Sequence, residues 1–327
     1  MTMSPELDSE RRLPQLEQQV QTLFVRDRRN LSWVRLREKG IFFCLIGCGL
    51  FSLLITGSII FVLASETIRF FQFPEVTISN FFLSTEWTPL LGNTKSFGIW
   101  ALISGTLLVT AIAMILALPL GLITAVYLSE YAPRRVRSTL KPILEILAGI
   151  PTVVYGFFAL MTITPFLQWC YGGFNVYNAM SAGIAVGILC FPTVCSLAED
   201  ALRAVPSSLR DGAFGLGGTR FDATVKVIIP AALSGIISAF LLAIARAIGE
   251  TMIVALAAGT RAQVTLNPGD EVQTMTGYMV QIAGGDVSNF GIEYYSMYAV
   301  AFTLFAITLS LTMIGNHIRK KYRETYD

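Results

Sequence analysis

Long stretches without a charged residue are the feature of this sequence that most limits what it can fold into. One runs from residue 40 to 65 and another from 98 to 129. A helix of about 20 apolar residues spans a hydrocarbon core about 30 Å thick, so each run is long enough to cross a membrane. Only 14% of the residues are charged, whereas soluble domains carry about 25%. The sequence therefore predicts an all-α integral membrane protein.

Four more spans follow from the rest of the chain. Residues 146–198 carry no charge and are too many for one helix, but turn and aromatic residues at 168–178 divide them into a third and a fourth span. Residues 230–260 predict a fifth span and residues 294–318 a sixth. Six transmembrane helices place both termini on the same side of the membrane.

Lysine and arginine indicate which side that is. Residues 1–39 hold eight of them, and the loops after the second and fourth spans and the C-terminal end hold four each. The opposite loops hold only Arg69, Lys95 and Arg261. Cytoplasmic loops carry the excess of positive charge, so both termini are predicted to be cytoplasmic. The predicted organisation is a cytoplasmic arm (1–39), a permease domain (40–318) and a cytoplasmic tail (319–327).

The remaining segments outside the spans permit more than one interpretation. In the arm, Leu13, Leu16, Val20 and Leu23 recur at helical spacing, which indicates either a short amphipathic helix or a weakly ordered tail. The outer loops, 66–97 and 261–293, are rich in aromatic and acidic residues, and they either receive a soluble partner or simply face solvent.

The sequence gives no basis for a metal site, a cofactor or a nucleic-acid partner. The five cysteines lie in or beside apolar runs without a C-x-x-C pair, and the sole histidine is His317. A zinc or haem site would need more ligands at usable spacing. The net charge is only +2, so no global basic field exists for nucleic acid.

The loop at 199–230 predicts a docking element. Its first part has apolar residues at helical spacing, followed by a glycine-rich break at 215–218, a second segment at 219–229, and Pro230. Glycine permits the positive φ angles of such a turn. A short protruding helix is suited to lie in a groove of another protein. The chain has no G-x-x-x-x-G-K-[ST] phosphate loop, so a transporter of this design needs a separate ATPase.

This loop resembles the EAA loop of ABC-importer permeases, which reads roughly E-A-A-x-x-x-G with a later I-x-L-P. Asp211 stands for the glutamate and Gly212 for the first alanine. The positions that keep the family residue are Ala213, Gly217, Ile228 and Pro230. The resemblance implies that the loop docks on the ATPase and transmits its closure to the membrane helices.

Two charges stand inside the predicted fifth span. Arg246 and Glu250 are four residues apart, so in a continuous helix they share a face. A charge at the bilayer centre costs about 2.5–3.5 kcal/mol, so both should face a protein interior or an aqueous path. One interpretation is a mutual salt bridge that locks helices together. The other is that Arg246 binds an anionic substrate while Glu250 holds the guanidinium in place. At the entry to the third span, Lys141 and Glu145 are also spaced to pair.

Four stretches extend the resemblance to the PstC-type permeases of bacterial phosphate-specific transport. They are residues 97–110, 119–133, 140–156 and 245–252, and the likeness covers residues 40 to 320. The intramembrane arginine and glutamate of that family correspond to Arg246 and Glu250.

The resemblance implies a non-enzymatic subunit with the type I ABC importer (MetI-like) fold, lying in the bacterial inner membrane and moving inorganic phosphate. It also implies a second permease of the PstA kind, two cytoplasmic ATPase subunits that bind the ATP, and an external phosphate-binding protein. Three alternatives stay open. The chain could be a permease for another oxyanion such as molybdate, sulfate or phosphonate, an ion-coupled carrier or channel that works without ATP, or a purely structural membrane protein.

Overall fold

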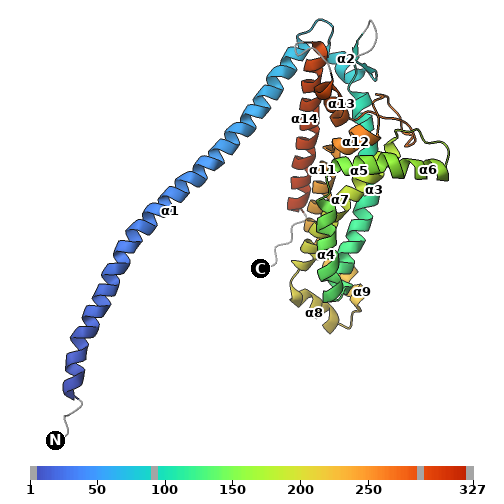
Figure 1. The fold of residues 1–327 in the computed structure, drawn as a ribbon. Helices are drawn as coiled ribbons and strands as arrows, with labels where there is room; N and C mark the ends of the chain where they lie inside the picture. The colour runs from blue at the N-terminus through green and yellow to red at the C-terminus, as the bar shows by residue number, and fades with distance from the viewer. Residues whose placement is uncertain (1–5, 90–94, 286–290, 322–327) are drawn as a thin grey trace. The chain divides into compact units, whose positions relative to one another are not determined.

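A computed structural model describes residues 6–89, 95–285 and 291–321 (Figure 1). Helices dominate, and within the described ranges the one sheet is a two-stranded antiparallel hairpin of β1 (Trp87–Thr88) and β2 (Ser96–Phe97). The chain divides into two compact units, Met1–Val62 and Leu63–Asp327. The second unit holds both candidate functional regions.

The first unit is the greater part of one long helix, α1 (Glu6–Phe71). The helix begins well before the first predicted span, and the amphipathic segment at 13–23 lies within it. From Arg37 onward the helix is apolar enough to cross a membrane, and its large apolar side chains between Ile41 and Val62 are exposed. Exposed apolar surface of this extent is typical of residues that meet lipid or another subunit.

The second unit is built around α3 (Trp100–Val126) and α7 (Ala179–Arg203), which make the most extensive helix–helix contact. Small side chains let the two backbones approach closely, as in other membrane helix pairs. Ala113, Ala117, Ala182 and Ala185 are all fully buried. Helix α11 (Leu233–Ile248) packs on both α7 and α3, and α14 (Ile292–Lys321) packs on α11.

Gly183 lies at a close approach of α7 to α3. A Cβ at this position would lie 2.6 Å from Cβ of Ile112 and 3.2 Å from the carbonyl oxygen of Val109. We expect Gly183→Ala to destabilise the purified protein by about 1–3 kcal/mol, because one of the helices must move to admit the methyl group. Thermal unfolding in detergent measures this effect. Gly57→Ala is the matched control, since nothing lies within 4 Å of that position. An unchanged melting temperature for Gly183→Ala would contradict the close packing.

The predicted third span is interrupted. Residues 134–148 form α4, which lies beside α7, and the chain then breaks at 149–151. It continues as α5 (Thr152–Phe158), a π-helical turn (Ala159–Ile163) and α6 (Thr164–Cys170). Figure 1 shows α5 and α6 crossing the direction of α3 and α7. Pro151 explains the break, because the residue before a proline is disfavoured in helical conformation and proline has no N–H to donate.

The predicted fifth span is broken twice. Residues 220–231 form a helical segment made of α9 (Arg220–Ala223), a π-helical turn (Thr224–Ile228) and α10 (Ile229–Ala231), and the chain bends by 68° before α11. Pro230 lies inside α10, so it does not end the segment as expected. The second break follows Ile248, after which come α12 (Met252–Ala257) and α13 (Met275–Gly284). The helix α13 lies in the predicted outer loop and was not foreseen.

The end of the unit that carries the predicted outer loops is an aromatic cluster. Helix α2 (Ile78–Leu83) and the β1–β2 hairpin pack against α13 and the end of α1. The rings of Phe70, Phe81, Trp87 and Phe97 contact one another edge to face, and Trp87 meets Tyr278 of α13 with ring centroids 5.0 Å apart. The loop 66–97 is thus a folded cap in its described part.

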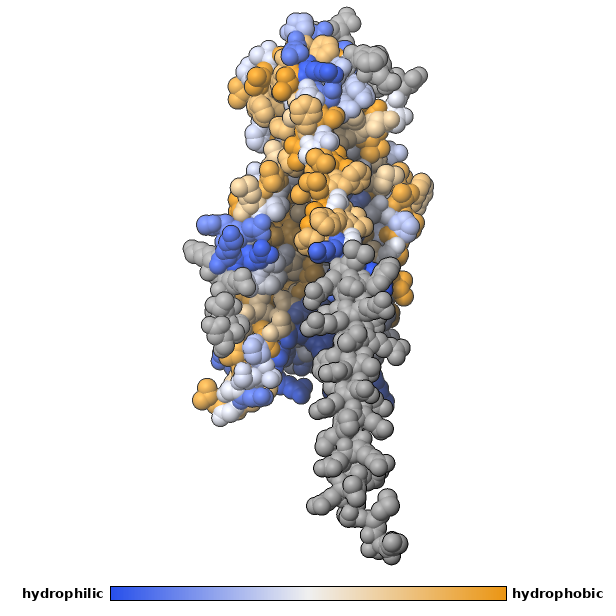
Figure 2. All heavy atoms as spheres, turned by 90° about the vertical axis from the view of Figure 1, so that its left-hand side faces the viewer, coloured by the Kyte–Doolittle hydropathy of each residue, from blue (hydrophilic) through white to orange (hydrophobic). Residues whose placement is uncertain are grey.

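Six membrane crossings agree with the helices of the structure. Five helices of the described chain are long and apolar enough to span a membrane, and the bent pair of residues 220–231 and α11 supplies a sixth. Figure 2 shows extensive apolar surface on the face that it draws. The side of the membrane on which each terminus lies stays a prediction.

Candidate functional site

The second break of the fifth span separates the two intramembrane charges. Helix α11 ends at Ile248, and Glu250 lies in the connection before α12. The expectation that Arg246 and Glu250 share one helical face is therefore wrong. No ion pair joins them in the described structure, so the mutual salt bridge is not formed.

Glu250 instead caps the helix that follows. Its Oε1 accepts the backbone N–H of Thr251 at 3.1 Å and that of Ile253 at 3.5 Å. A carboxylate at a helix N-terminus satisfies otherwise unpaired N–H groups and complements the helix dipole. The residue is only 8% exposed. Glu250 thus stabilises the broken backbone inside the span.

Hydroxyl groups from neighbouring elements form hydrogen bonds with backbone groups near this break. Thr276, at the start of α13, donates its hydroxyl to the carbonyl oxygen of Glu250 at 2.6 Å. Thr106 of α3 accepts the N–H of Met275 at 3.0 Å. Non-helical backbone is tolerated at membrane depth only where protein or water satisfies it. Here the buried hydroxyl groups of Thr106 in α3 and Thr276 in α13 are the partners of these backbone groups.

Arg246 lies half-buried on α11 and reaches across to α7. Its Nη1 donates a hydrogen bond to Oγ1 of Thr193 at 2.9 Å. A guanidinium carries five N–H donors in a fixed fork. Among the residues described, Thr193 is the one side chain that accepts a hydrogen bond from this guanidinium. Arg246 therefore keeps most of its donors for another ligand.

A hollow of about 310 Å³ adjoins this contact. Helices α4, α7 and α11 form its wall, and Thr193 is part of that wall. The other polar side chains around it are Lys141, Glu145, Ser196 and Glu199. The lining is mostly apolar, and the hollow is connected to Arg246 through Thr193, which lines it and accepts the hydrogen bond of the guanidinium.

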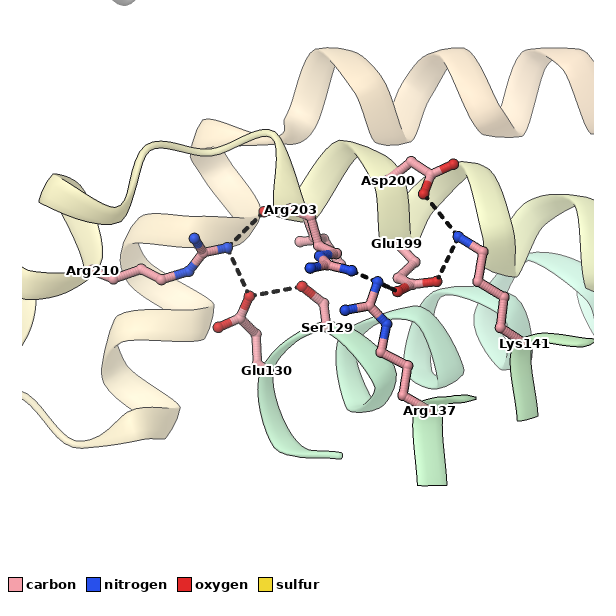
Figure 3. Close-up of polar contacts among 9 residues, drawn as sticks. Ser129, Glu130, Arg137, Lys141, Glu199, Asp200, Arg203 and Arg210 are labelled. Carbon is pink, nitrogen blue, oxygen red and sulfur yellow. Dashed lines mark hydrogen bonds and ion pairs between the residues drawn. The ribbon is translucent and has the colours of Figure 1, made fainter. Parts of the chain in front are cut away.

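Glu199 is the centre of an ion-pair cluster at one end of the hollow (Figure 3). Its carboxylate pairs with Arg137, with Lys141 at 3.5 Å and with Arg203 at 3.9 Å, and the residue is 1% exposed. Buried carboxylates are almost always paired in this way. The sequence analysis did not single out Glu199, and its place at the end of an uncharged run was the signal available.

Lys141 bonds within this cluster and not to Glu145 as expected. Its Nζ donates to Oδ1 of Asp200 at 3.2 Å. Burial alone would lower the pKa of Lys141, but the hydrogen bond to Asp200 and the charge of Glu199 raise it above its usual value. The resulting contribution to stability is present at neutral pH and is lost only as the pH rises through the raised pKa.

A second charged contact lies beside the first. Arg210 of α8 (Ser207–Gly215) pairs with Glu130, which lies in the π-helical turn Tyr127–Tyr131 at the end of α3. The two side chains meet at 3.1 Å, and Ser129 donates its hydroxyl to the same Glu130 oxygen at 2.8 Å. Figure 3 shows both clusters next to each other.

The predicted docking loop is a protrusion with a glycine turn. Helix α8 ends at Gly215, Gly217 has a φ of +81°, and Thr219 then caps α9 through a capping box with Asp222. This confirms the predicted order of helix, glycine turn and helix. Leu216, at the tip, is 92% exposed.

The structure divides the residues of the EAA-like pattern into two groups. Asp211, Gly212 and Gly217 are exposed on the protrusion, with Ala213 half-buried beside them. Ile228 is buried against α3 and α7, and Pro230 lies in α10 on the way into the span. One group is therefore accessible to a partner, while the other connects the protrusion to α11.

A family model described as "Binding-protein-dependent transport system inner membrane component" matches residues 117–324. The match covers the helices from α3 to α14, including the protrusion, Arg246 and Glu250.

Curated relatives include phosphate permeases. The probable ABC transporter permease protein YqgH of Bacillus subtilis (strain 168) is 27% identical, over 84% of this chain and 88% of its own. The phosphate transport system permease protein PstC of Mesorhizobium japonicum is 31% identical, over 73% of this chain and 77% of its own. A probable PstC of Methanocaldococcus jannaschii is also 31% identical, over 70% of this chain and 77% of its own.

Solved structures share the fold at lower identity. A bacterial alginate ABC transporter, solved in complex with a periplasmic protein bound to alginate pentasaccharide, matches with a TM-score of 0.63 and 13% identity, over 89% of this chain and 97% of that one. The MetNI methionine ABC transporter matches with a TM-score of 0.52 and 18% identity, and the match covers 69% of this chain and 95% of that one. The fold is that of ABC-transporter permeases.

Proposed function

The chain belongs to the family of inner membrane components of binding-protein-dependent transport systems, and on that premise we propose that it is one permease subunit of an ATP-driven importer of inorganic phosphate. It is a multi-pass protein of the inner membrane. Relatives named as phosphate permeases at 31% identity support phosphate as the substrate.

One observation carries the proposal, namely an intramembrane guanidinium with free donors. Arg246 donates one hydrogen bond to Thr193, and Thr193 lines a hollow of about 310 Å³, which is large enough for a small anion. Forked N–H donors match phosphate oxygens, and arginine stays charged at any working pH. Phosphate thus meets a fixed positive charge inside the span, between α7 and α11.

Glu250 acts through the backbone in this proposal. Its carboxylate holds the start of α12, and α11 ends only two residues after Arg246. A rigid break fixes where the last turn of α11 points, and with it the guanidinium. Glu250 is therefore a positioning residue for the substrate path.

The protrusion is the ATPase contact. Asp211, Gly212, Ala213 and Gly217 form its accessible side, and Ile228 and Pro230 connect it to α11. The complete importer then contains a second permease of the PstA kind, two ATPase subunits on the cytoplasmic side, where both termini of this chain lie, and an external phosphate-binding protein. ATP binds to the partner subunits and this chain is not an enzyme.

Uptake by the reconstituted importer tests the function. The four kinds of subunit are placed in vesicles with ATP inside, and entry of labelled phosphate is compared with that of labelled sulfate and molybdate. We expect uptake of phosphate that requires ATP and the ATPase subunits. A preference for sulfate or molybdate would show that this oxyanion, and not phosphate, is the substrate. Uptake without ATP would favour an ion-coupled carrier.

Thr193→Val gives a milder test of the same path. Valine keeps the shape but removes the acceptor that orients Arg246, and a hydrogen bond to a charged group contributes about 1.5–3 kcal/mol. We expect the phosphate uptake rate at low concentration to fall by about tenfold. Thr303→Val is the matched control, because the Thr303 hydroxyl bonds only to the carbonyl oxygen of Ala299 in its own helix. Equal phosphate uptake by the two variants would contradict a role of Thr193 in orienting Arg246.

A further inference from the structure

Two helices at the end of α7 lie on the surface of the bundle and are attached to it by charged contacts as well as apolar ones. They are α4 (Arg134–Ala148) and α8 (Ser207–Gly215), and neither of these fully described helices has a buried residue. The end of α7 between them is buried, with Ala198 and Leu202 fully enclosed. The two surface helices therefore share one rigid neighbour.

Arg210 provides the attachment of α8. Its Nη1 donates to the carbonyl oxygen of Val205 at 3.0 Å, and its Nη2 donates to that of Leu202 at 2.9 Å. These are carbonyls at the C-terminal end of α7, where a cation is favoured by the helix dipole. The same Nη2 reaches Glu130 at 3.1 Å. One guanidinium thus connects α8 to the ends of both α7 and α3.

Glu199 provides the attachment of α4. Arg137 and Lys141, one turn apart on α4, both pair with its carboxylate. Lys141 also reaches Asp200, the next residue of α7. The apolar residues Leu140, Leu144 and Leu147 of α4 are partly buried and also pack against the core. Glu199 is 1% exposed, so salt screens its pair with Arg137 less than it screens the pair of Lys141 with Asp200, whose side chain is exposed.

The geometry lets α4 move as a unit. At one end α4 follows Glu130 after only a short connection, 131–133, and at the other it stops at the break of 149–151. Attraction between charges falls off slowly with distance, whereas packing contacts are lost over a fraction of an ångström. A helix that is held in part by charges and lies between two breaks in helical structure can tilt while its charged partners still attract it.

The position of α4 determines the shape of the hollow beside Arg246. Lys141, Leu144, Glu145 and Ala148 of α4 line the hollow opposite Thr193 of α7. A tilt of α4 therefore widens or narrows this space. Movement of α8 would reach α4 through Arg210, Glu130 and the end of α7.

We propose that Arg210 with Glu130, and Glu199 with Arg137 and Lys141, form a charged linkage that couples the ATPase-facing helix α8 to α4 and so opens and closes the hollow beside Arg246. This inference rests on the proposed function, since it assumes that a partner ATPase moves α8. Within the linkage, Glu199 and Arg210 are positioning residues that do not touch the transported anion.

The test measures coupling separately from transport. The complete importer with Glu199→Gln, or with Arg210→Gln, is reconstituted with the binding protein, and phosphate entry and ATP hydrolysis are recorded together. We expect assembled complexes that still hydrolyse ATP, with phosphate moved per ATP reduced by about tenfold, which is within the usual range of coupling between sites. Glu199→Asp, which keeps the charge, should recover part of the ratio.

Glu293→Gln is the matched control, because it breaks an ion pair of α14 with Lys95 that does not involve α8. It should leave the ratio unchanged. A normal ratio in Glu199→Gln and Arg210→Gln, while the unaltered importer transports phosphate, overturns the linkage and leaves the proposed function standing. If the importer with Glu199→Gln does not assemble, the ratio of phosphate moved per ATP in the Arg210→Gln importer is the deciding measurement, because the Arg210 side chain is partly exposed. No phosphate uptake by the unaltered importer would instead overturn the proposed function.

Discussion

Phosphate uptake is expected to fall about 100-fold or more in Arg246→Gln, while the importer still assembles and reaches the membrane. Glutamine keeps a donor for Thr193 but loses the charge and the forked donors of the guanidinium. Charge-assisted hydrogen bonds contribute about 1.5–3 kcal/mol each, and losing two of them to the anion accounts for the fall. The rate of labelled phosphate entry into vesicles measures it.

Two further arginine variants make the result specific. Arg246→Lys keeps a positive charge without the fork, so its uptake should lie between that of the original protein and that of the glutamine variant. Arg261→Gln removes an exposed arginine from the outer loop and should transport normally. Normal uptake in Arg246→Gln would remove the guanidinium from the substrate path.

Gly217→Val is expected to abolish import for a different reason. Gly217 has a φ of +81°, a region that costs an L-residue about 1–2 kcal/mol and a β-branched residue more. The turn would rearrange and displace Leu216 and the end of α8 from their places on the protrusion. We expect the ATPase subunits to be lost on co-purification, while the permease itself remains folded in the membrane.

Gly212→Ala is the matched control for the turn. Nothing lies within 4 Å of either glycine, so the two positions differ in backbone conformation and not in space. Gly212 is inside α8, where alanine is favoured over glycine by about 1 kcal/mol and is also the residue of the family pattern. Full retention of the ATPase is expected for Gly212→Ala. Retention by Gly217→Val as well would show that the turn is not needed for docking.

The number of spans and the docking loop could be predicted because they depend on local signals. Absence of charge over about 20 residues is sufficient for a membrane helix. The turn was predicted at the glycine-rich residues 215–218 because a positive φ favours glycine, and the structure has this conformation at Gly217.

Breaks inside apolar runs could not be predicted in the same way. Residues 248–252 have no proline, although Gly249 is the C-cap residue of α11. The break is stabilised by Glu250, which caps α12, and by Thr276, which donates a hydrogen bond to the carbonyl oxygen of Glu250. Thr276 lies far along the sequence, so only the tertiary structure brings it to the break. The partner of Arg246 was missed for the same reason, since Thr193 belongs to α7.

The pairing of Lys141 shows how tertiary contacts override local spacing. Glu145 lies one turn away on the same helix, yet α7 offers Glu199 and Asp200 at the cluster. A buried carboxylate gains more from a cation than an exposed one does, because less water competes for it. Glu145 is exposed and remains at the rim of the hollow.

The capping carboxylate of Glu250 has a consequence for how long an anion dwells in the permease. The start of a helix is a ready binding place for phosphate, and here a side chain of the protein already fills it. An arriving anion therefore meets Arg246 without open N–H groups of a helix start beside it, so its residence should be brief. Tight capture would then be left to the soluble receptor outside, and the membrane subunit would favour rapid turnover over retention.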